Sequence, residues 1–240
     1  MIRLSAEAVT VRRAGKSLIE AISFAAEGGD FIALVGPNGA GKTTLMRALA
    51  GLEAPAAGRA SVDGADVRAL APAVRARKIA YLPQAREVAW AITAEAVVAL
   101  GRFAFGSAQR LSADSRAAVE RALAAADAAA FRARTMPTLS GGEQARVHLA
   151  RALAAETPIL LADEPTAALD PRHAQAIMGA LRAKADAGAI VVAALHDLRS
   201  ARKFCTRMIV LDRGRLVADD APERALTPAL IEQVFGVADH

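Results

Sequence analysis

Unbroken apolar runs recur along the chain, and each is bounded by polar or turn-forming residues. The runs are FIALVG (31–36), KIAYLP (78–83), PILLAD (158–163) and AIVVAALH (189–196). Strands that are apolar on both faces belong to parallel sheets covered by helices. Helical stretches follow the first, third and fourth runs, as parallel connections require. The pattern therefore predicts an α/β core with a mostly parallel sheet.

The two ends of the chain carry a different pattern. Residues 1–30 read as short strands with turns at RRAGKS and EGGD, which predicts an antiparallel β layer at the N-terminal edge. Near the other end, RMIVLDRGRLVAD predicts a hairpin around Arg213 and Gly214. The tail TPALIEQVFGV (227–237) predicts a short helix.

The strand signal disappears between Gln84 and Pro158. The stretch SADSRAAVERALAAADAAAFRAR (112–134) begins with a serine suited to an N-cap and continues as an alanine-rich helix. This block predicts a helical lobe inserted into the α/β core. We expect one domain over residues 1–240, with the core and β layer in 1–84 and 158–240 and the helical lobe in 85–157.

Composition excludes several classes of protein. No run approaches the roughly 20 strongly apolar residues of a spanning helix, and the N-terminus lacks a signal-peptide core, so we expect a cytoplasmic chain, soluble or peripheral. The net charge of +5 permits anionic partners, but the arginines are dispersed and one Trp and one Tyr offer few platforms for bases. Nucleic acid is not expected as a partner. The single cysteine, Cys205, is expected to pack in the interior.

A glycine-rich segment, GPNGAGKT (36–43), matches G-x-x-x-x-G-K-[ST] and lies between the strand 31–35 and a helical stretch. Backbone N–H groups of such a loop wrap phosphates, Lys42 reaches the β and γ oxygens, and the Thr43 hydroxyl ligates magnesium. A purely structural glycine turn is the alternative. We therefore expect a P-loop NTPase core that binds ATP and Mg²⁺. The residues expected to hold the nucleotide here are Gly36, Pro37, Asn38, Gly39, Ala40, Gly41, Lys42, Thr43 and Thr44.

Two adjacent carboxylates end the apolar run ILLAD. Alone, Asp163 and Glu164 before a proline would usually mark only a turn at the end of a strand. After a P-loop, Asp163 is placed to hold the metal, and Glu164 to polarise a water aimed at the γ-phosphate. We therefore interpret Asp163 as a magnesium ligand and Glu164 as the catalytic base.

A second candidate phosphate cradle lies in TLSGGEQAR (138–146), where a hydroxyl and two glycines precede a helix. Leu139-Ser140-Gly141-Gly142-Glu143 resembles the signature motif of the ATP-binding cassette (ABC) ATPases, and the P-loop resembles theirs as well. Gln84 is similar to their Q-loop glutamine, Ala168-Leu169-Asp170 to their D-loop, and His196 to their switch histidine. The resemblance covers nearly the whole chain.

This resemblance implies a head-to-tail dimer, in which the signature of one cassette covers the ATP on the P-loop of the other. It also implies a catalytic set and a metal set that overlap. The catalytic set is Glu164, His196, Gln84 and Lys42, the metal set is Thr43, Gln84 and Asp163, and the further nucleotide contacts are Ser140, Gly141, Gly142, Glu143, Asp170 and Arg13.

The chain departs from the family pattern at two positions. Glu143 stands where many cassettes have glutamine, as in some importers, and Arg13 stands where an aromatic commonly stacks on adenine. Arginine can stack through its planar guanidinium, but selectivity for adenine is left open. Asp170 can also cap the helix that begins at Pro171. Three histidines are expected to be structural or solvated, namely His148, His173 and His240.

Softer similarities indicate a subfamily. ITAEAVVALGRFAFG (92–106), the tail from Leu226 and LSGGEQARVHLARAL resemble ATPases of importers for iron-siderophores, haem and cobalamin. They imply an ATP-hydrolysing, energy-coupling subunit, peripheral at the cytoplasmic face of the inner membrane. Its partners would be a second cassette copy, multi-span permease subunits and, indirectly, an extracytoplasmic solute-binding protein. Trp90 would meet the permease or be half-buried.

Other readings stay open at this point. One alternative within transport is the ATPase of an exporter or of a lipoprotein-release system. Another class is a soluble cassette acting on Fe–S assembly, DNA or the ribosome. A bare P-loop kinase is disfavoured by the signature motif.

Overall fold

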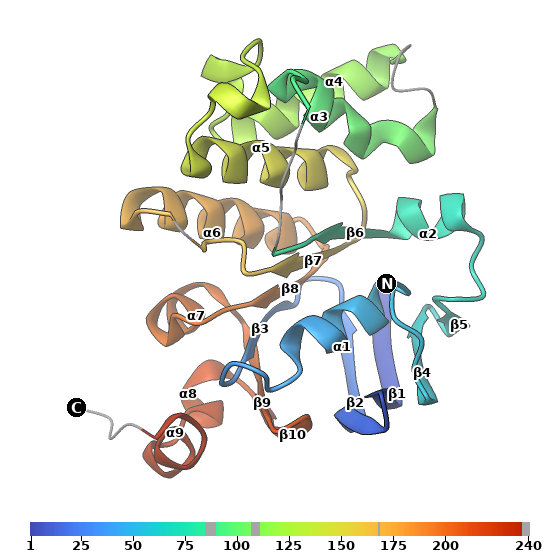
Figure 1. Ribbon diagram of the computed structural model, residues 1–240, viewed down its shortest axis with the longest axis vertical. Coiled ribbons are helices and arrows are strands. Elements are labelled where there is room, and N and C mark those ends of the chain that lie inside the picture. Colours follow the sequence, from blue (N-terminus) through green and yellow to red (C-terminus); the bar gives the residue numbers. More distant parts are fainter. Residues whose placement is uncertain (85–89, 107–110, 168, 237–240) are drawn as a thin grey trace.

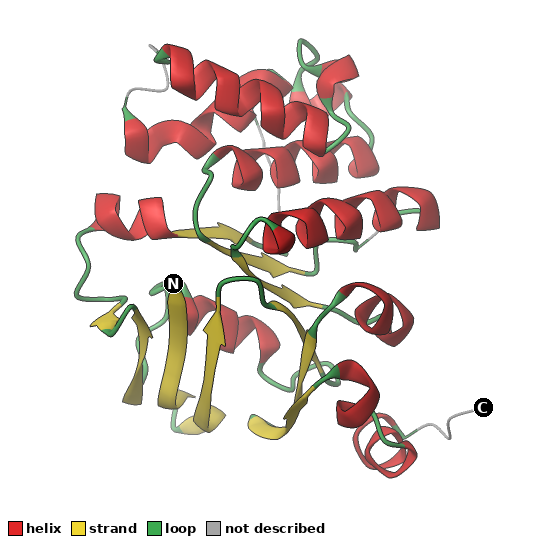
Figure 2. Ribbon diagram, turned by 180° about the vertical axis from the view of Figure 1, so that it is seen from behind, coloured by secondary structure: helices red, strands yellow, loops and turns green. Residues whose placement is uncertain are grey.

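The computed structural model describes residues 1–84, 90–106, 111–167 and 169–236. Two sheets occupy one end of the molecule, and a layer of helices lies at the other end (Figures 1 and 2). The expected fold class is confirmed, because a largely parallel sheet, an antiparallel sheet and a helical segment are all present. Within the described ranges, no helix combines the length and apolar character needed to cross a membrane.

The larger sheet has six strands in the order β10-β9-β3-β8-β7-β6. All neighbours pair in parallel except β9 and β10, which form the predicted antiparallel hairpin. At its tip, Arg213 and Gly214 have φ values of 46° and 80°, as a two-residue hairpin turn with the matching twist requires. The bounds are β3 Phe31–Val35, β6 Ile79–Leu82, β7 Ile159–Asp163, β8 Ile190–Ala194, β9 Arg207–Asp212 and β10 Arg215–Asp220.

The apolar runs are unbroken because both faces of this sheet are covered. Successive side chains of a strand point to opposite faces. In β3, Phe31, Ala33 and Val35 pack into the core beneath the helices. Ile32 and Leu34 pack into a second core between the two sheets. The strands β7 and β8 divide their residues in the same way.

The smaller sheet is antiparallel, in the order β2-β1-β4-β5. The expected strands of residues 1–30 are present, but they are long rather than short, at 11 and 12 residues. Register shifts interrupt their pairing, and Ala8 and Ala21 have φ values near the left-handed region, 47° and 48°. These bulges break the alternation that a single strand would show. The bounds are β1 Arg3–Arg13, β2 Lys16–Glu27, β4 Ala57–Val62 and β5 Ala65–Asp66.

The helices of the core lie on both sides of the six-stranded sheet. Helix α1 contacts β1, β2 and β4 as well as β7, so it lies between the sheets (Figure 1). The helices α6 and α7 contact β3 from the other side. The predicted tail helix is present as α9, and Thr227 caps it. The bounds are α1 Lys42–Leu49, α2 Pro72–Lys78, α6 Pro171–Asp186, α7 Leu198–Phe204, α8 Pro222–Ala225 and α9 Pro228–Phe235.

The helical layer comes from the middle of the chain. Ser112 caps α4 as predicted, since its hydroxyl accepts the N–H of Ser115 at 3.1 Å. Apolar residues of α3, α4 and α5 belong to the same core as the outer face of the six-stranded sheet. The bounds are α3 Ala94–Ala99, the 3-10 helix η1 Leu100–Phe105, α4 Ala113–Ala125, η2 Ala129–Phe131, η3 Met136–Thr138 and α5 Gly141–Ala154.

Two segments of this layer pair through their backbones. The carbonyls of Arg134 and Arg132 accept the N–H groups of Ala94 and Glu95 at 2.9 and 3.0 Å. In the other direction, the N–H of Met136 donates to the carbonyl of Ile92 at 2.9 Å. Residues 132–136, which lead into the signature motif, are thereby fixed to the start of α3.

Gly101 permits a close approach between η1 and α5. A Cβ at this position would lie 2.2 Å from the carbonyl oxygen of Arg151. We expect Gly101→Ala to lower the free energy of unfolding by about 1–3 kcal/mol, because the backbones must separate. Thermal unfolding followed by circular dichroism would measure this loss.

The matched control is Gly179→Ala in α6, where a Cβ would meet no heavy atom within 4 Å. Alanine is the better helix former by about 1 kcal/mol, so this variant should be neutral or slightly more stable. Equal unfolding temperatures for the Gly101 variant and the wild type would contradict the packing argument.

Candidate functional site

The P-loop connects β3 to α1 and has a backbone that requires glycine. Gly36, Gly39 and Gly41 have φ values of 150°, 80° and 101°. A Cβ on Gly36 would lie 2.2 Å from the carbonyl oxygen of Leu211, and one on Gly41 would lie 2.4 Å from Ile19 Cγ2. Side chains are excluded at these points, so the loop keeps its N–H groups accessible to an anion.

Lys42 lies inside this loop with only 6% of its surface exposed. Its Nζ donates to the carbonyls of Gly36 and Pro37 at 2.6 and 3.0 Å. Burial lowers the pKa of Lys42, and the charges of Glu164 and Asp163 oppose that shift. The ammonium group is therefore held over the place where the loop would receive phosphates.

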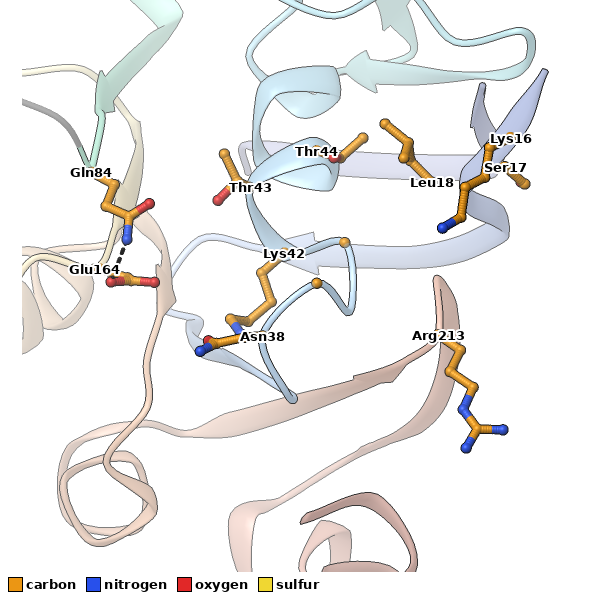
Figure 3. A pocket seen from close by; sticks show the side chains of 12 residues that line it. Lys16, Ser17, Leu18, Asn38, Lys42, Thr43, Thr44, Gln84, Glu164 and Arg213 are labelled. Carbon is orange, nitrogen blue, oxygen red and sulfur yellow. Dashed lines mark hydrogen bonds between the residues drawn. The ribbon is translucent and has the colours of Figure 1, made fainter. Parts of the chain in front are cut away.

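A pocket of about 610 Å³ surrounds the P-loop (Figure 3). It brings the P-loop together with Gln84 and Glu164, which come from distant parts of the chain. Its wall also contains residues that the sequence did not indicate. The lining residues are Lys16, Ser17, Leu18, Asn38, Gly39, Gly41, Lys42, Thr43, Thr44, Gln84, Glu164 and Arg213.

The hairpin tip places Arg213 at this pocket. The N–H of Gly214 donates to the P-loop carbonyl of Ala40 at 3.1 Å, and the Gly214 carbonyl accepts the N–H of Glu20 at 2.8 Å. The tip is thus fixed between the P-loop and β2. No local sequence pattern could show this, because the three segments are far apart along the chain.

Asp163 lies at the end of β7 with 1% of its surface exposed. The hydroxyl of Tyr81 donates to its Oδ2 at 3.2 Å. Burial raises the pKa of Asp163, and the nearby hydroxyls of Thr43 and Tyr81 partly oppose the rise. A buried carboxylate beside the Thr43 hydroxyl is an oxygen pair of the kind that Mg²⁺ prefers.

Glu164, the next residue, lines the pocket. Its φ of 49° is uncommon for a residue with a side chain. The Gln84 amide donates to Oε2 at 2.7 Å (Figure 3). His196 Nε2 lies 2.6 Å from Oε1. Two residues that follow β6 and β8 therefore meet at the carboxylate that follows β7.

The signature motif lies elsewhere, at the start of α5. Ser140 and Glu143 form a capping box, in which the Ser140 hydroxyl accepts the Glu143 N–H at 3.3 Å and Glu143 Oε2 accepts the Ser140 N–H at 2.8 Å. A Cβ on Gly141 would meet no heavy atom within 4 Å. The lining of the P-loop pocket includes none of Ser140, Gly141, Gly142 and Glu143.

Asp170 caps α6, as expected from the proline that follows it. Its Oδ1 accepts the N–H of His173 at 3.0 Å, and His173 Nδ1 lies 2.5 Å from Oδ2. The bond from the His173 backbone lowers the pKa of Asp170. A Cβ on Gly142 of the signature would lie 3.4 Å from Leu169 Cδ2, and Ala168 lies outside the described residues.

Three further expectations have structural outcomes. Arg13 forms an ion pair with Glu53 at 3.0 Å and does not line the pocket. Trp90 is 78% exposed, so the half-buried alternative is wrong. Cys205 is buried, as expected. Among the remaining histidines, His148 is buried, and His240 lies outside the described residues.

The chain is similar to known ATP-binding proteins over most of its length. The ABC transporter family profile matches residues 19–167. A hemin import ATP-binding protein of Pseudomonas entomophila is 43% identical over 98% of this chain and 92% of its own length. A cobalamin import ATP-binding protein of Halobacterium salinarum is 41% identical over 97% of this chain and 58% of its own length.

Solved structures agree with the fold. A dimeric ATP-binding cassette in a post-hydrolysis state, bound to ADP and Pi, has a TM-score of 0.81 and 28% identity, covering 91% of this chain and 98% of that one. An inward-facing putative metal-chelate type ABC transporter has a TM-score of 0.85 at 22% identity, covering 99% of this chain and 90% of that one. At 22% identity, the metal-chelate type transporter supports the fold alone.

Proposed function

We propose that this chain, which belongs to the ABC transporter family and is one of its ATP-binding ATPases, is the energy-coupling subunit of a membrane importer. The observation that carries the proposal is identity above 40% with hemin and cobalamin import proteins over nearly the whole chain. The solute would be haem, cobalamin or an iron-siderophore. The chain would sit peripherally at the cytoplasmic face of the inner membrane, where a permease receives solute from an extracytoplasmic binding protein.

The proposed metal site fits Mg²⁺. Thr43, Asp163 and Gln84 would hold the ion with oxygen atoms. Asp163 supports this assignment, because its buried carboxylate is costly to ionise and a nearby cation would offset that cost. When bound, Mg²⁺ would neutralise charge on the phosphate oxygens. The P-loop N–H groups and Lys42 would hold the β and γ oxygens beside it.

Glu164 is the proposed general base. Its carboxylate lies in the pocket wall, where it can accept a proton from a water aimed at the γ-phosphate. His196 contacts one carboxylate oxygen and would orient it, while Gln84 contacts the other. In this arrangement Glu164 does the proton chemistry, and its two neighbours position it.

The nucleobase is expected at the far end of the pocket from Glu164. Lys16, Ser17 and Leu18 form that wall (Figure 3). Arg13 could stack on the base only after its guanidinium leaves Glu53. We therefore propose that residues 16–18 form the part of the pocket wall closest to the base. Arg13 would contact the base from outside this wall.

A second copy of this chain is the proposed partner at the nucleotide. The exposed signature cap at Ser140 and Gly141 is outside its own pocket, which supports a role on the ATP of a partner cassette. The similar cassette that forms a dimer with bound ADP and Pi supports a pairing of two copies. ATP bound between two copies would favour the closed dimer, and hydrolysis would release it.

An apolar patch supports docking to a permease. The patch consists of Val74, Leu100 and Phe103, which are 44%, 45% and 73% exposed. Helices α2 and η1 are held together there, since Arg77 donates to the carbonyl of Ala104 at 2.8 Å. Exposed apolar clusters mark interaction sites. Trp90, also exposed, lies ten residues before Leu100.

Purification of the tagged protein from gently solubilised host membranes would test this function. We expect a multi-span protein to co-purify, and Trp90→Ser/Phe103→Ser to reduce its recovery by about tenfold or more, because exposed aromatics dominate interface energies. ATP hydrolysis by the isolated variant should stay within about twofold of wild type, since neither residue lines the pocket.

The matched control is Leu52→Ser, because Leu52 is another exposed apolar side chain, at 53%. It should leave recovery unchanged. Co-purification with ribosomes, DNA factors or Fe–S assembly proteins, without any membrane chain, would contradict the transport proposal. Co-purification with an exporter or a lipoprotein-release system would contradict the proposed inward direction of transport.

A further inference from the structure

Arg134 lies between η2 and η3, beside the helix that carries the signature. Its Nη1 donates to Glu143 Oε1 at 3.0 Å, and its Nη2 donates to the carbonyl of Thr138. The side chains of Arg134 and Glu143 are 47% and 23% exposed. The guanidinium therefore spans from the loop before the signature to a carboxylate within it.

Both oxygens of Glu143 are engaged. Oε2 accepts the N–H of Ser140 and completes the capping box, while Oε1 accepts from Arg134. The bond from the Ser140 backbone lowers the pKa of Glu143, and the Arg134 charge acts in the same direction. Glu143 is thus an anion fixed within the first turn of α5.

A fixed anion at this place conflicts with the proposed task of the signature. The first turn of a helix attracts phosphate through its N–H groups and its positive dipole end. A carboxylate in that turn cancels part of the attraction and repels a triphosphate. The repulsion grows when a second cassette covers the site, because excluding water lowers the effective dielectric constant.

We propose that Arg134 is a positioning residue for the signature motif, which neutralises Glu143 so that the capped helix start can receive the triphosphate of the partner cassette. This inference rests on the proposed function, because it assumes the head-to-tail dimer. The same pairing explains how the fifth signature position, Glu143, can be a glutamate. An uncharged glutamine there would keep the cap through its amide oxygen and would need no counterion.

A double-mutant cycle in a Glu164→Gln background would test the proposal. The ATP concentration giving half-maximal dimer would be measured by gel filtration. We expect Arg134→Ala to raise it by about tenfold, equivalent to one well-placed charge interaction. Arg134→Ala/Glu143→Gln should return to within about twofold of Glu143→Gln alone, and Arg134→Lys should keep most of the affinity.

Two further readouts separate charge compensation from simple loop support. The Arg134→Ala shift should shrink at high salt, since screening weakens the uncompensated charge. The control Arg116→Ala also removes an arginine bond to a carbonyl, that of Leu111, but has no carboxylate partner in the contacts described. This control should leave the ATP concentration for half-maximal dimer unchanged.

The outcomes distinguish a failure of the proposed dimer from a failure of the inference about Arg134. If the background variant forms no dimer at any ATP concentration, the proposed dimer itself is wrong. If it does form a dimer, an unchanged midpoint for Arg134→Ala overturns the inference. A raised midpoint that Glu143→Gln does not rescue also overturns it, because Arg134 would then act only through the loop.

Discussion

Lys42→Ala is expected to abolish ATP binding at micromolar concentrations and to reduce hydrolysis by at least about 10²-fold. The reason is the place of the ammonium group. It is buried, and its Nζ already bonds to the carbonyls of Gly36 and Pro37 at the centre of the loop. No other cation among the described pocket residues lies within the P-loop itself. Phosphate release and equilibrium nucleotide binding would measure the two losses.

A matched control comes from Lys16, which lines the same pocket at its outer wall. Lys16→Ala should weaken ATP binding far less, by about fivefold, because an exposed charge contributes about 1 kcal/mol. Unfolding curves should show both variants folded. Wild-type turnover by the Lys42 variant would remove the assignment of this loop as the phosphate site.

Glu164→Gln is expected to bind ATP normally but to hydrolyse it about 10²–10⁴-fold more slowly, because glutamine cannot accept the proton. The substitution preserves shape, so contacts to Gln84 and His196 can persist as amide hydrogen bonds. ATP should then accumulate in a closed dimer. Gel filtration with ATP would show the dimer, and phosphate release would show the stalled reaction.

The control for this variant is Glu7→Gln, which removes a carboxylate paired with Arg59 on the antiparallel sheet. It should hydrolyse at the wild-type rate and remain monomeric in the same assay. Normal hydrolysis by the Glu164 variant would show that another group, or water alone, takes the proton.

The elements that were predictable are those encoded locally. The run FIALVG predicted β3 because each of its strand residues is buried on one face or the other. Turn residues at Arg213 and Gly214 predicted the hairpin, and Ser112 predicted the start of α4. In each case the signal lies within a few residues and reflects backbone sterics, capping or burial.

The features that escaped prediction depend on long-range placement. Strand β4 and helix α2 lack a strong periodic pattern, and β4 forms by pairing with β1, from Leu4 with Val62 to Thr10 with Ala57, far apart along the chain. Lys16 and Arg213 reach the pocket only because strand β2 and the tip of the β9–β10 hairpin lie beside the P-loop. The position of Arg13 in the sequence alone suggests a contact with the base, whereas its partner in the structure, Glu53, comes from the chain after α1.

The backbone pairing of residues 92–95 with 132–136 has a mechanical consequence. One segment lies just beyond the exposed Trp90, and the other leads to the signature cap. A force that displaces the first must carry the second with it or break three hydrogen bonds. Under the proposed function, the two segments would move together, so that docking near Trp90 and closure at Ser140 would be coupled through these bonds.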